Sequence, residues 1–164
     1  MEIRPAALAD LDAIMEIYEH ARTYMAEQGN ASQWGQFYPF RELLEEDIRK
    51  NQCYVCTVSG QVCGVFVLVL GEEPNYRVIE GGSWKNSNPY GVIHRLASGG
   101  TVPGVFGACL EFCKAQIPDL RADTHENNRT MQHLLEKYGF ERRGVIRIQD
   151  GDTVDGSSRI AYQL

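Results

Sequence analysis

The sequence predicts an α+β fold in which helices and strands alternate around one mixed sheet. Four segments carry apolar residues at three- and four-residue steps, which is typical of amphipathic helices. Seven shorter segments are rich in β-branched residues or bounded by Gly, Pro, Asn and Ser, as strands are. Their order along the chain is βααβββαβαββ, which favours helices packed on a single sheet.

The first half of the chain is expected to form a strand, two helices and a hairpin. Asp10 is a candidate N-cap for the long first helix, and Gly29 is expected to end it. The turn of the hairpin is Ser59-Gly60-Gln61. The expected elements are a strand at 3–5, helices at 10–29 and 42–50, and strands at 53–58 and 62–70.

The second half is expected to alternate strands with helices. A short helix or edge segment is expected near 76–79. Gly139 should end the last helix, and a turn-rich connector at 150–156 should join the two closing strands. The expected elements are strands at 90–97, 120–124, 140–148 and 158–162, and helices at 105–116 and 128–138.

Length and composition are typical of one cytoplasmic enzyme or binding domain. The 164 residues suit a single domain over 1–164. There are 16 basic and 22 acidic residues, so a nucleic-acid partner has little support. No apolar run approaches the ~20 residues that a membrane helix needs, and the first residues lack the order of a signal peptide. We therefore expect neither a nucleic acid nor a membrane as partner.

The five cysteines are expected to be reduced, buried and free of metal. Cys53 and Cys56 match a CxxC spacing, but they lie in a β-branched segment. Cys109 and Cys113 are four residues apart on a predicted helix. No second CxxC and no close histidine pair completes a zinc set. The sequence therefore predicts structural thiols and no metal cofactor.

A strand, a glycine-rich loop and a helix follow one another after residue 90. The strand includes Val92 to Ser98, and the loop ends at Gly104. Unpaired N–H groups and the helix dipole at such an N-terminus favour a phosphate, and glycines let the backbone approach it closely. The pattern is neither GxxxxGK[ST] nor a well-formed GxGxxG. A purely structural loop is therefore an open alternative.

A second polar segment follows the strand expected at 120–124. Asp123 and His125 lie at the end of that strand, and Asn128 opens the helix that ends before Gly139-Phe140. Taken alone, this segment is explained by helix structure, with Asn128 as the N-cap and Gly139 as the residue that follows the last turn.

In this order and spacing, the two segments resemble the GNAT family of N-acetyltransferases. The family's loop motif [QR]-x-x-G-x-[GA] is similar to Thr101-Val-Pro-Gly104-Val-Phe106, and its later helix is matched by Asn128, Met131, Gly139 and Phe140. The likeness extends to a bacterial subgroup over almost the whole chain, through Ile3–Ala6, Asp10–Ile14, Gln33-Trp34, Tyr38-Pro39, Glu80–Trp84, Ile93–Ala97 and Asp123–His125.

The resemblance implies a three-layer fold whose sheet splays between its fourth and fifth strands, here 90–97 and 120–124. Acetyl-CoA would lie in the gap as cosubstrate, and Asn128 would reach it from the last helix. The backbone groups expected to pair with pantetheine and thioester are those of Leu96, Ala97 and Ser98. The pyrophosphate would rest on the loop and helix start at Gly104, Val105, Phe106, Gly107 and Ala108.

The loop departs from the family pattern at three positions. Thr101 stands where Gln or Arg is usual, and Pro103 removes one N–H. Phe106 holds a position that is usually Gly or Ala, unless a shift of one residue brings Gly107 there.

The last helix departs from the pattern as well. Leu135 stands where many relatives carry the Tyr that protonates the leaving thiolate. Tyr138, about one turn further on, is the candidate for that role. Simple packing of Tyr138 is the alternative.

Direct transfer to an amine also needs a base. His94 lies two residues before Leu96, on the same strand face by alternation, and histidine titrates in the useful range. Asp123 and His125 would relay protons or bind the acceptor. A packing or hydrogen-bonding role remains open for each of them.

Aromatic and amide side chains in two loops are candidates for the acceptor pocket, with core packing as the alternative. These candidates are Gln33, Trp34, Tyr38 and Trp84. The acidic runs Glu45-Glu46-Asp47 and Glu72-Glu73 are expected to be solvated, as are His20 and His133.

Two functions remain open at this point. The first is an N-acetyltransferase that moves an acetyl group from acetyl-CoA to a primary amine of a small molecule or peptide, by direct attack in a ternary complex. The second is a catalytically idle CoA-binding sensor or scaffold with the same fold, which the altered loop and Leu135 keep open. Pairing into a homodimer also stays open.

Overall fold

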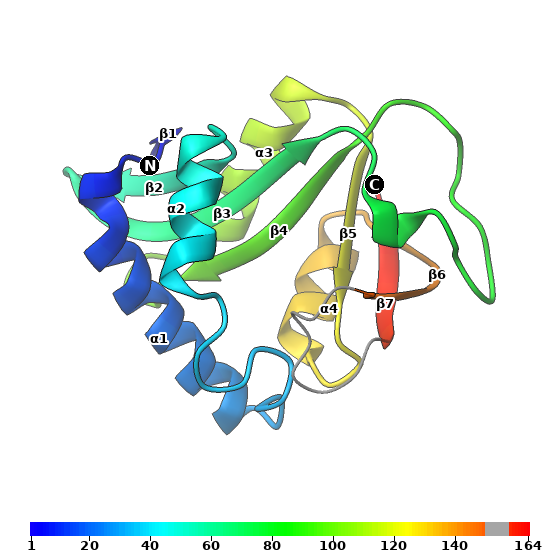
Figure 1. The fold of residues 1–164 in the computed structure, drawn as a ribbon, viewed down its shortest axis with the longest axis horizontal. Helices are drawn as coiled ribbons and strands as arrows, with labels where there is room; N and C mark the ends of the chain where they lie inside the picture. Colours follow the sequence, from blue (N-terminus) through cyan, green and yellow to red (C-terminus); the bar gives the residue numbers. More distant parts are fainter. Residues whose placement is uncertain (150–157) are drawn as a thin grey trace.

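One seven-stranded sheet organises the described residues, which are 1–149 and 158–164 of the computed structural model (Figure 1). The strand order is β1-β2-β3-β4-β5-β7-β6, and β4–β5 is the parallel pair. The strands are β1 Glu2–Pro5, β2 Cys53–Val58, β3 Gln61–Leu70, β4 Gly91–Ser98, β5 Leu120–Thr124, β6 Glu141–Arg147 and β7 Ser158–Gln163.

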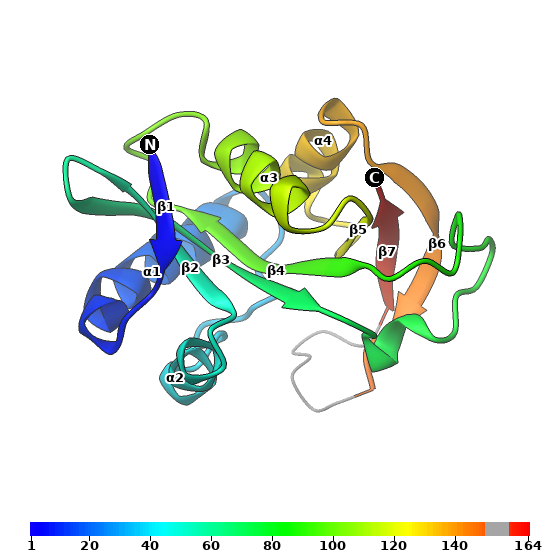
Figure 2. The ribbon, with the colours of Figure 1, turned by 90° about the horizontal axis from the view of Figure 1, so that it is seen from above.

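Helices cover both faces of this sheet, so the fold has the three layers expected. Figure 2 shows α1 (Leu11–Glu27) and α2 (Arg41–Arg49) on one face, and α3 (Val105–Gln116) and α4 (Arg129–Lys137) on the other. Short 3-10 turns lie at Leu8–Asp10 and Pro74–Tyr76. The predicted element order is confirmed, and the connector expected at 150–156 lies outside the described residues.

The helix ends follow the glycines that the sequence points to. Gly29 and Gly139 come after α1 and α4 with φ of 84° and 95°, the left-handed region that glycine adopts without strain. Asp10 occupies the N-cap position of α1, as expected, but its side chain makes no capping hydrogen bond to that helix. Its carboxylate accepts instead from the backbone N–H of Ala7 at 2.8 Å and pairs with Arg4.

The sheet opens between β4 and β5, as the resemblance implies. The two strands pair only at Gly91 with Leu120 and at Val92 with Arg121. Beyond these pairs β4 continues alongside β3 as far as Ser98, while β5 turns away with β7. The result is the V-shaped gap seen in Figure 1.

Two apolar clusters fill the space between the sheet and its helices. One joins α3 and α4 to the sheet and contains Cys56, Cys109 and Cys113, and the other joins α1 and α2 to the opposite face. All five cysteines are free and buried, as predicted. Among the described residues, no three His, Cys, Asp or Glu side chains form a group that could hold a metal ion. In that same part of the chain, no helix is both long and apolar enough to cross a membrane.

Candidate functional site

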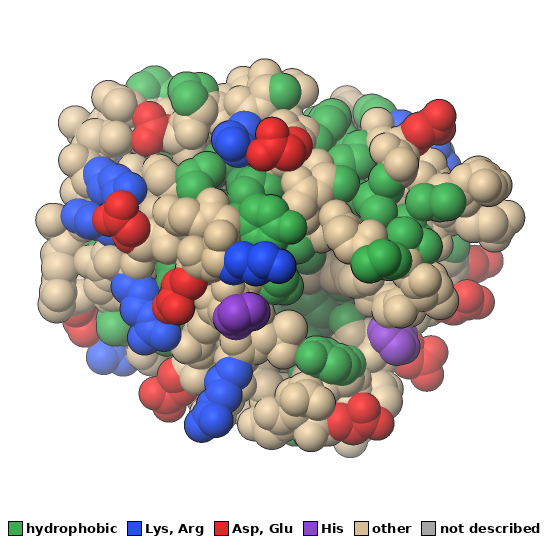
Figure 3. Space-filling view, turned by 180° about the vertical axis from the view of Figure 1, so that it is seen from behind, with side chains coloured by type: hydrophobic (Ala, Val, Ile, Leu, Met, Phe, Trp, Pro, Cys, Tyr) green, Lys and Arg blue, Asp and Glu red, His purple; other side chains and the backbone are tan. Residues whose placement is uncertain are grey.

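A cavity of about 650 Å³ lies in the gap between β4 and β5. Figure 3 shows a hollow on the face that carries α3 and α4, bordered by hydrophobic side chains and a histidine. The cavity wall is built from β4 and β5, from α1 and α4, and from the segment 28–40 that joins α1 to α2. Its lining residues include Gln33, Trp34, Tyr38, Glu73, Tyr76, His94, Leu96, Ala97, Ser98, Phe106, Asp123, Thr124, Asn128, Leu135 and Arg159.

A bulge in β4 sets the direction of its side chains. Val67 pairs with His94 and Val65 with Ala97, so β4 contains one residue more than β3 over this stretch. Arg95, inside the bulge, has a φ of 50°, which is rare for a residue with a side chain. The extra residue breaks the alternation of the strand.

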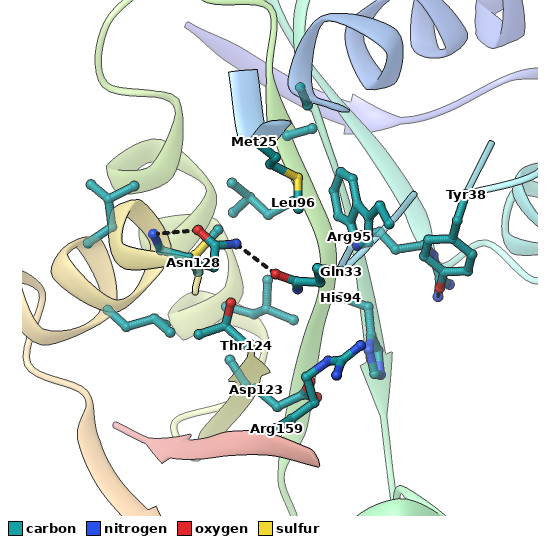
Figure 4. Close-up of a pocket in the computed structure, with 18 of the residues that line it drawn as sticks. Met25, Gln33, Tyr38, His94, Arg95, Leu96, Asp123, Thr124, Asn128 and Arg159 are labelled. Carbon is teal, nitrogen blue, oxygen red and sulfur yellow. Dashed lines mark hydrogen bonds between the residues drawn. The ribbon is translucent and has the colours of Figure 1, made fainter. Parts of the chain in front are cut away.

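The expectation that His94 and Leu96 share a face is therefore wrong. Leu96 packs with Ile93 against the cluster on the α3 side, although the two residues are three positions apart. His94 instead faces Glu73, its ion-pair partner. Figure 4 shows the side chains of Leu96 and His94 leaving β4 in different directions.

The bulge is held in place from the α1 and α2 side. The hydroxyl of Tyr18, fully buried, donates to the carbonyl oxygen of Arg95 at 2.7 Å. The Arg95 guanidinium donates to Asp47 at 2.7 Å and to the hydroxyl of Tyr38 at 3.3 Å. Asp47 is only 5% exposed, so the expectation that it is solvated is wrong. Burial raises the pKa of Asp47, and the charge of Arg95 opposes that rise.

His94 and Glu73 form a pair on the cavity wall. His94 Nε2 lies 3.4 Å from Glu73 Oε2, and the two side chains are 22% and 18% exposed. The hydrogen bond from His94 lowers the pKa of Glu73, against the effect of burial, and the N–H of Asn75 adds to the lowering. Glu73 was expected to be solvated. It turns inward because its carboxylate caps the 3-10 turn that starts at Pro74.

A second acidic group lies on the β5 side of the cavity. Asp123 accepts a hydrogen bond from the hydroxyl of Tyr76 at 2.6 Å. Burial, together with the charge of Asp123, raises the pKa of Tyr76 well above its usual value. Arg159, on β7, is 4% exposed and lies beside Asp123 in Figure 4. One of its amino groups donates to the carbonyl of Ser158.

Thr124, the last residue of β5, also lines the cavity and is 1% exposed. Its hydroxyl oxygen is buried and has no hydrogen-bond partner among the described residues.

The segment 28–40 touches α4 across the open end of the gap. Asn128 accepts from the N–H of Met131 at 3.1 Å and so caps α4, as predicted. Its amide nitrogen donates to Gln33 Oε1 at 3.1 Å (Figure 4). Tyr24, near the end of α1, shares a second hydrogen bond with Thr130. A residue expected to bind the cofactor and one expected to bind the acceptor are thereby in direct contact.

The N-terminus of α3 forms the other end of the candidate site. Gly104 precedes the helix with a φ of 85° and open space around its Cα. The N–H of Ala108 is the first to bond within the helix, to Gly104 O. The N–H groups of Val105, Phe106 and Gly107 therefore lack intrahelical partners. His20 is exposed, as expected, and lies against Gly100 in the preceding loop.

Phe106 and Tyr138 pack together between α3 and α4. Phe106 is 7% exposed, and its ring centroid lies 5.1 Å from that of Tyr138. A Cβ at position 107 would lie 2.6 Å from the Tyr138 hydroxyl, so a side chain there would have to displace the Tyr138 ring. Tyr138 is not among the lining residues of the cavity, whereas Leu135 is.

Two residues expected near the acceptor lie outside the cavity lining. Trp84 donates to the carbonyl of Tyr76 at 2.9 Å and stacks under the guanidinium of Arg121. His125 turns back to accept the N–H of Asn127 at 3.0 Å. Gly104, Val105, Gly107 and Ala108 also lie outside the lining, at the start of α3.

Several side chains that sequence reasoning did not assign to the site line the cavity, and Glu73, Tyr76, Thr124 and Arg159 are among them. Thr124 was within reach of the sequence, since it lies between two residues already singled out at a strand end. The inward direction of Glu73, by contrast, depends on a turn that the sequence indicates only as a short helix or edge.

The known proteins that this chain matches are solved structures. No protein-family model and no curated protein matches the chain. A GNAT-family acetyltransferase of Streptococcus agalactiae is 31% identical with a TM-score of 0.85, over 99% of this chain and 93% of that one. A Staphylococcus aureus protein assigned as an acetyltransferase is 25% identical with a TM-score of 0.69, over 100% and 98% of the two chains.

A more distant structure shares the fold. The GNAT phosphinothricin acetyltransferase of Sinorhizobium meliloti, solved in complex with acetyl-CoA, is 14% identical with a TM-score of 0.64, over 99% of this chain and 86% of that one. The Streptococcus agalactiae protein, by contrast, is close in both sequence and structure over nearly all of both chains. With its sheet splayed between β4 and β5, the chain belongs to the GNAT family of acetyltransferases.

Proposed function

We propose that the protein is an acetyl-CoA-dependent N-acetyltransferase that transfers the acetyl group directly to a primary amine in a ternary complex. The observation that carries the proposal is the His94–Glu73 pair on the wall of the cavity between β4 and β5. A base at this place is what a direct transfer needs, because an amine must lose a proton as it is acylated.

The chain's own groups fit acetyl-CoA. The first turn of α3 presents three N–H groups without intrahelical partners, and open space surrounds Gly104, so a pyrophosphate would be held there. On β4, Leu96, Ala97 and Ser98 line the cavity and would hold the pantetheine arm by their backbone groups. Asn128 would border the same arm from α4. Acetyl-CoA, when bound, supplies an activated acyl carbon and a thiol leaving group.

Glu73 gives His94 the orientation that a base requires. With Nε2 facing the carboxylate, the neutral ring carries its proton on Nε2 and has Nδ1 available to accept one. The lowered pKa of Glu73, caused first by the hydrogen bond from His94, keeps the carboxylate charged at neutral pH. A charged Glu73 stabilises His94 once it has taken a proton.

The acceptor half of the cavity is suited to a cationic amine. The carboxylates of Glu73 and Asp123 both line it, as do Gln33, Trp34 and Tyr38. The acceptor we propose is a small molecule or a peptide end. The phosphinothricin acetyltransferase, which shares the fold, is named for a small-molecule acceptor.

Calorimetric titration with acetyl-CoA and with CoA, followed by an amine screen, tests the proposal. We expect micromolar binding of acetyl-CoA and measurable release of thiol with at least one amine. His94→Ala should lower kcat by about a hundredfold or more, the range for loss of a general base. It should leave the Kd of acetyl-CoA unchanged. Glu73→Gln should lower kcat about tenfold, and exposed Glu72→Gln serves as its matched control.

A second candidate is a CoA-binding sensor that catalyses nothing. The packing of Phe106 against Tyr138 supports it, because Tyr138, the candidate acid, then lies outside the cavity lining. Here the two rings lie between α3 and α4, next to the proposed pyrophosphate site. Tight binding of acetyl-CoA, without turnover of any amine and without an effect of His94→Ala, would favour the sensor. The absence of any binding would exclude both functions.

A further inference from the structure

We propose that the hydroxyl of Thr124 donates a hydrogen bond to the sulfur atom of the bound CoA group. This inference rests on the proposed function. Many relatives use a Tyr as the donor to the leaving sulfur, and this chain has Leu135 at that place, so we assign the role of donor to Thr124. Three observations carry it, namely the position of Thr124, its orphaned hydroxyl and the engagement or apolar character of Asn128, Tyr138 and Leu135.

The first observation is the position of Thr124 across the gap from the bulge. β4 and β5 pair at Gly91 with Leu120 and at Val92 with Arg121 before they separate. If the same parallel register continued, Thr124 would lie opposite Arg95, the bulge residue that precedes Leu96. The strands separate before that point, and Thr124 instead borders the same cavity as Leu96, Ala97 and Ser98, whose backbone groups are proposed to hold the thioester.

The second observation is the state of the hydroxyl. Thr124 is 1% exposed, its oxygen has no partner among the described residues, and the residue lines the cavity. Figure 4 shows its side chain pointing into the cavity, toward the contact between Asn128 and Gln33. Nearly all buried hydroxyls in proteins have a hydrogen-bond partner. We infer that a ligand atom in the cavity is that partner.

The third observation concerns the neighbouring groups. Leu135, at the place where many relatives carry a Tyr, is apolar, and the Tyr138 hydroxyl lies against Gly107 outside the cavity lining. The Asn128 amide is engaged with the N–H of Met131 and with Gln33. Asp123 is a hydrogen-bond acceptor that already faces the Tyr76 hydroxyl. A leaving sulfur needs a donor, and Thr124 supplies one.

The chemistry explains why a donor is useful at this point. In the transfer, the N–C bond forms and the C–S bond breaks, and the electron pair of the broken bond stays on sulfur. The proton of the amine passes to His94. A hydroxyl that donates to the sulfur stabilises its developing negative charge, because hydrogen bonds to charged groups are the stronger ones.

The test compares the binding of CoA with that of desulfo-CoA, which lacks the sulfur atom, by calorimetry. Thr124→Val removes the hydroxyl at nearly constant volume, and Thr124→Ser retains it. We expect Thr124→Val to weaken CoA binding about fivefold, the effect of one hydrogen bond. It should leave desulfo-CoA binding unchanged, and Thr124→Ser should bind both ligands like the wild type. Thr57→Val, at a buried threonine of β2 outside the cavity lining, is the control for folding effects.

The other outcomes overturn the inference in separable ways. Equal weakening for both ligands by Thr124→Val would mean that the residue only shapes the cavity. No weakening for either ligand would mean that water satisfies the hydroxyl. Weakening for acetyl-CoA alone would assign the hydroxyl to the carbonyl oxygen instead of the sulfur. If the wild-type protein bound neither CoA nor acetyl-CoA, the proposed function would fail, and this inference with it.

Discussion

At the scale of single residues, Glu73 lies in a different environment from the glutamate that precedes it in the chain. It follows exposed Glu72, which pairs with Arg77 at the surface. Glu73 itself caps a 3-10 turn and faces His94 inside the cavity. The two adjacent glutamates therefore differ in environment, because Glu72 points to solvent and Glu73 is held inside the cavity by two hydrogen bonds.

The depressed pKa of Glu73 predicts a loss of stability in acid. The hydrogen bond from His94 lowers the folded-state pKa below the unfolded value of about 4.3. The pair therefore adds stability that is fully present above that value and is lost as the pH falls through the folded pKa. In urea unfolding between pH 3 and 6, Glu73→Gln should show a flatter acid limb than the wild type.

Glu72→Gln, at the exposed neighbour, is the matched control for this measurement and should keep the acid limb of the wild type. Identical acid limbs for Glu73→Gln and the wild type would show that the His94 contact contributes nothing to stability.

At the scale of elements, the N-terminus of α4 joins two parts of the site. Asn128 caps the helix through Met131 and contacts Gln33 of the segment 28–40. α4 has only nine residues. A helix this short depends on its cap and on tertiary packing, since isolated helices of this length are marginal. The Asn128 side chain thus both caps α4 and connects α4 to the segment 28–40 across the open end of the gap.

Asn128→Ala is expected to lower the free energy of unfolding by about 1 kcal/mol, the usual cost of losing an N-cap. It should also release the segment 28–40 from α4, which faster hydrogen exchange in both segments would reveal. Asn127→Ala, at the exposed preceding position, is the matched control and should change neither quantity. Unchanged stability in Asn128→Ala would argue that α4 is held by its apolar face alone.

At the scale of the whole molecule, the reactivity of the cysteines measures how well the helices shield the two faces of the sheet from solvent. All five are buried and free. Burial raises the pKa of Cys53 and of Cys113 to about 12 in each case. Cys56 and Cys109 lie in contact, with their sulfur atoms 3.4 Å apart, in the cluster between β2 and α3. A thiol reagent can react with these cysteines only after the layers open and expose them to solvent.

The native protein at pH 8 is therefore expected to react with a disulfide reagent such as dithionitrobenzoate at none of its five thiols within minutes. In denaturant, all five should react at once. Rapid reaction of one or more thiols without denaturant would contradict the buried arrangement of the core. The same assay with acetyl-CoA present measures whether binding slows the opening of the layers.

Much of the architecture was predictable because it depends on local patterns. The bounds of α3 and β5 agree with prediction, and the hairpin turn at Ser59-Gly60 and the stop at Gly29 follow from turn chemistry. These features need only the period of apolar residues and glycines that tolerate positive φ. Membership of the GNAT family could likewise be inferred, because its motifs are short and lie in order along the chain.

The site itself was predictable only in part. His94, Gln33, Asn128 and Leu96 were named and do line one cavity, whereas Trp84 was named and packs elsewhere. The direction of a loop side chain depends on what it packs against, and for Trp84 that partner is Arg121 on β5. No local pattern indicates such a distant contact.

The sequence by itself therefore determined the element order, the family and some of the residues around the cavity. Only the tertiary structure decided which way the β4 side chains face, because the bulge at Arg95 is held by Tyr18 and Asp47, which lie 77 and 48 residues away in the chain. It also decided that Glu73 belongs to the site and that Tyr138 faces α3. These outcomes depend on distant side chains meeting in space, whereas periods and caps depend on neighbours in sequence.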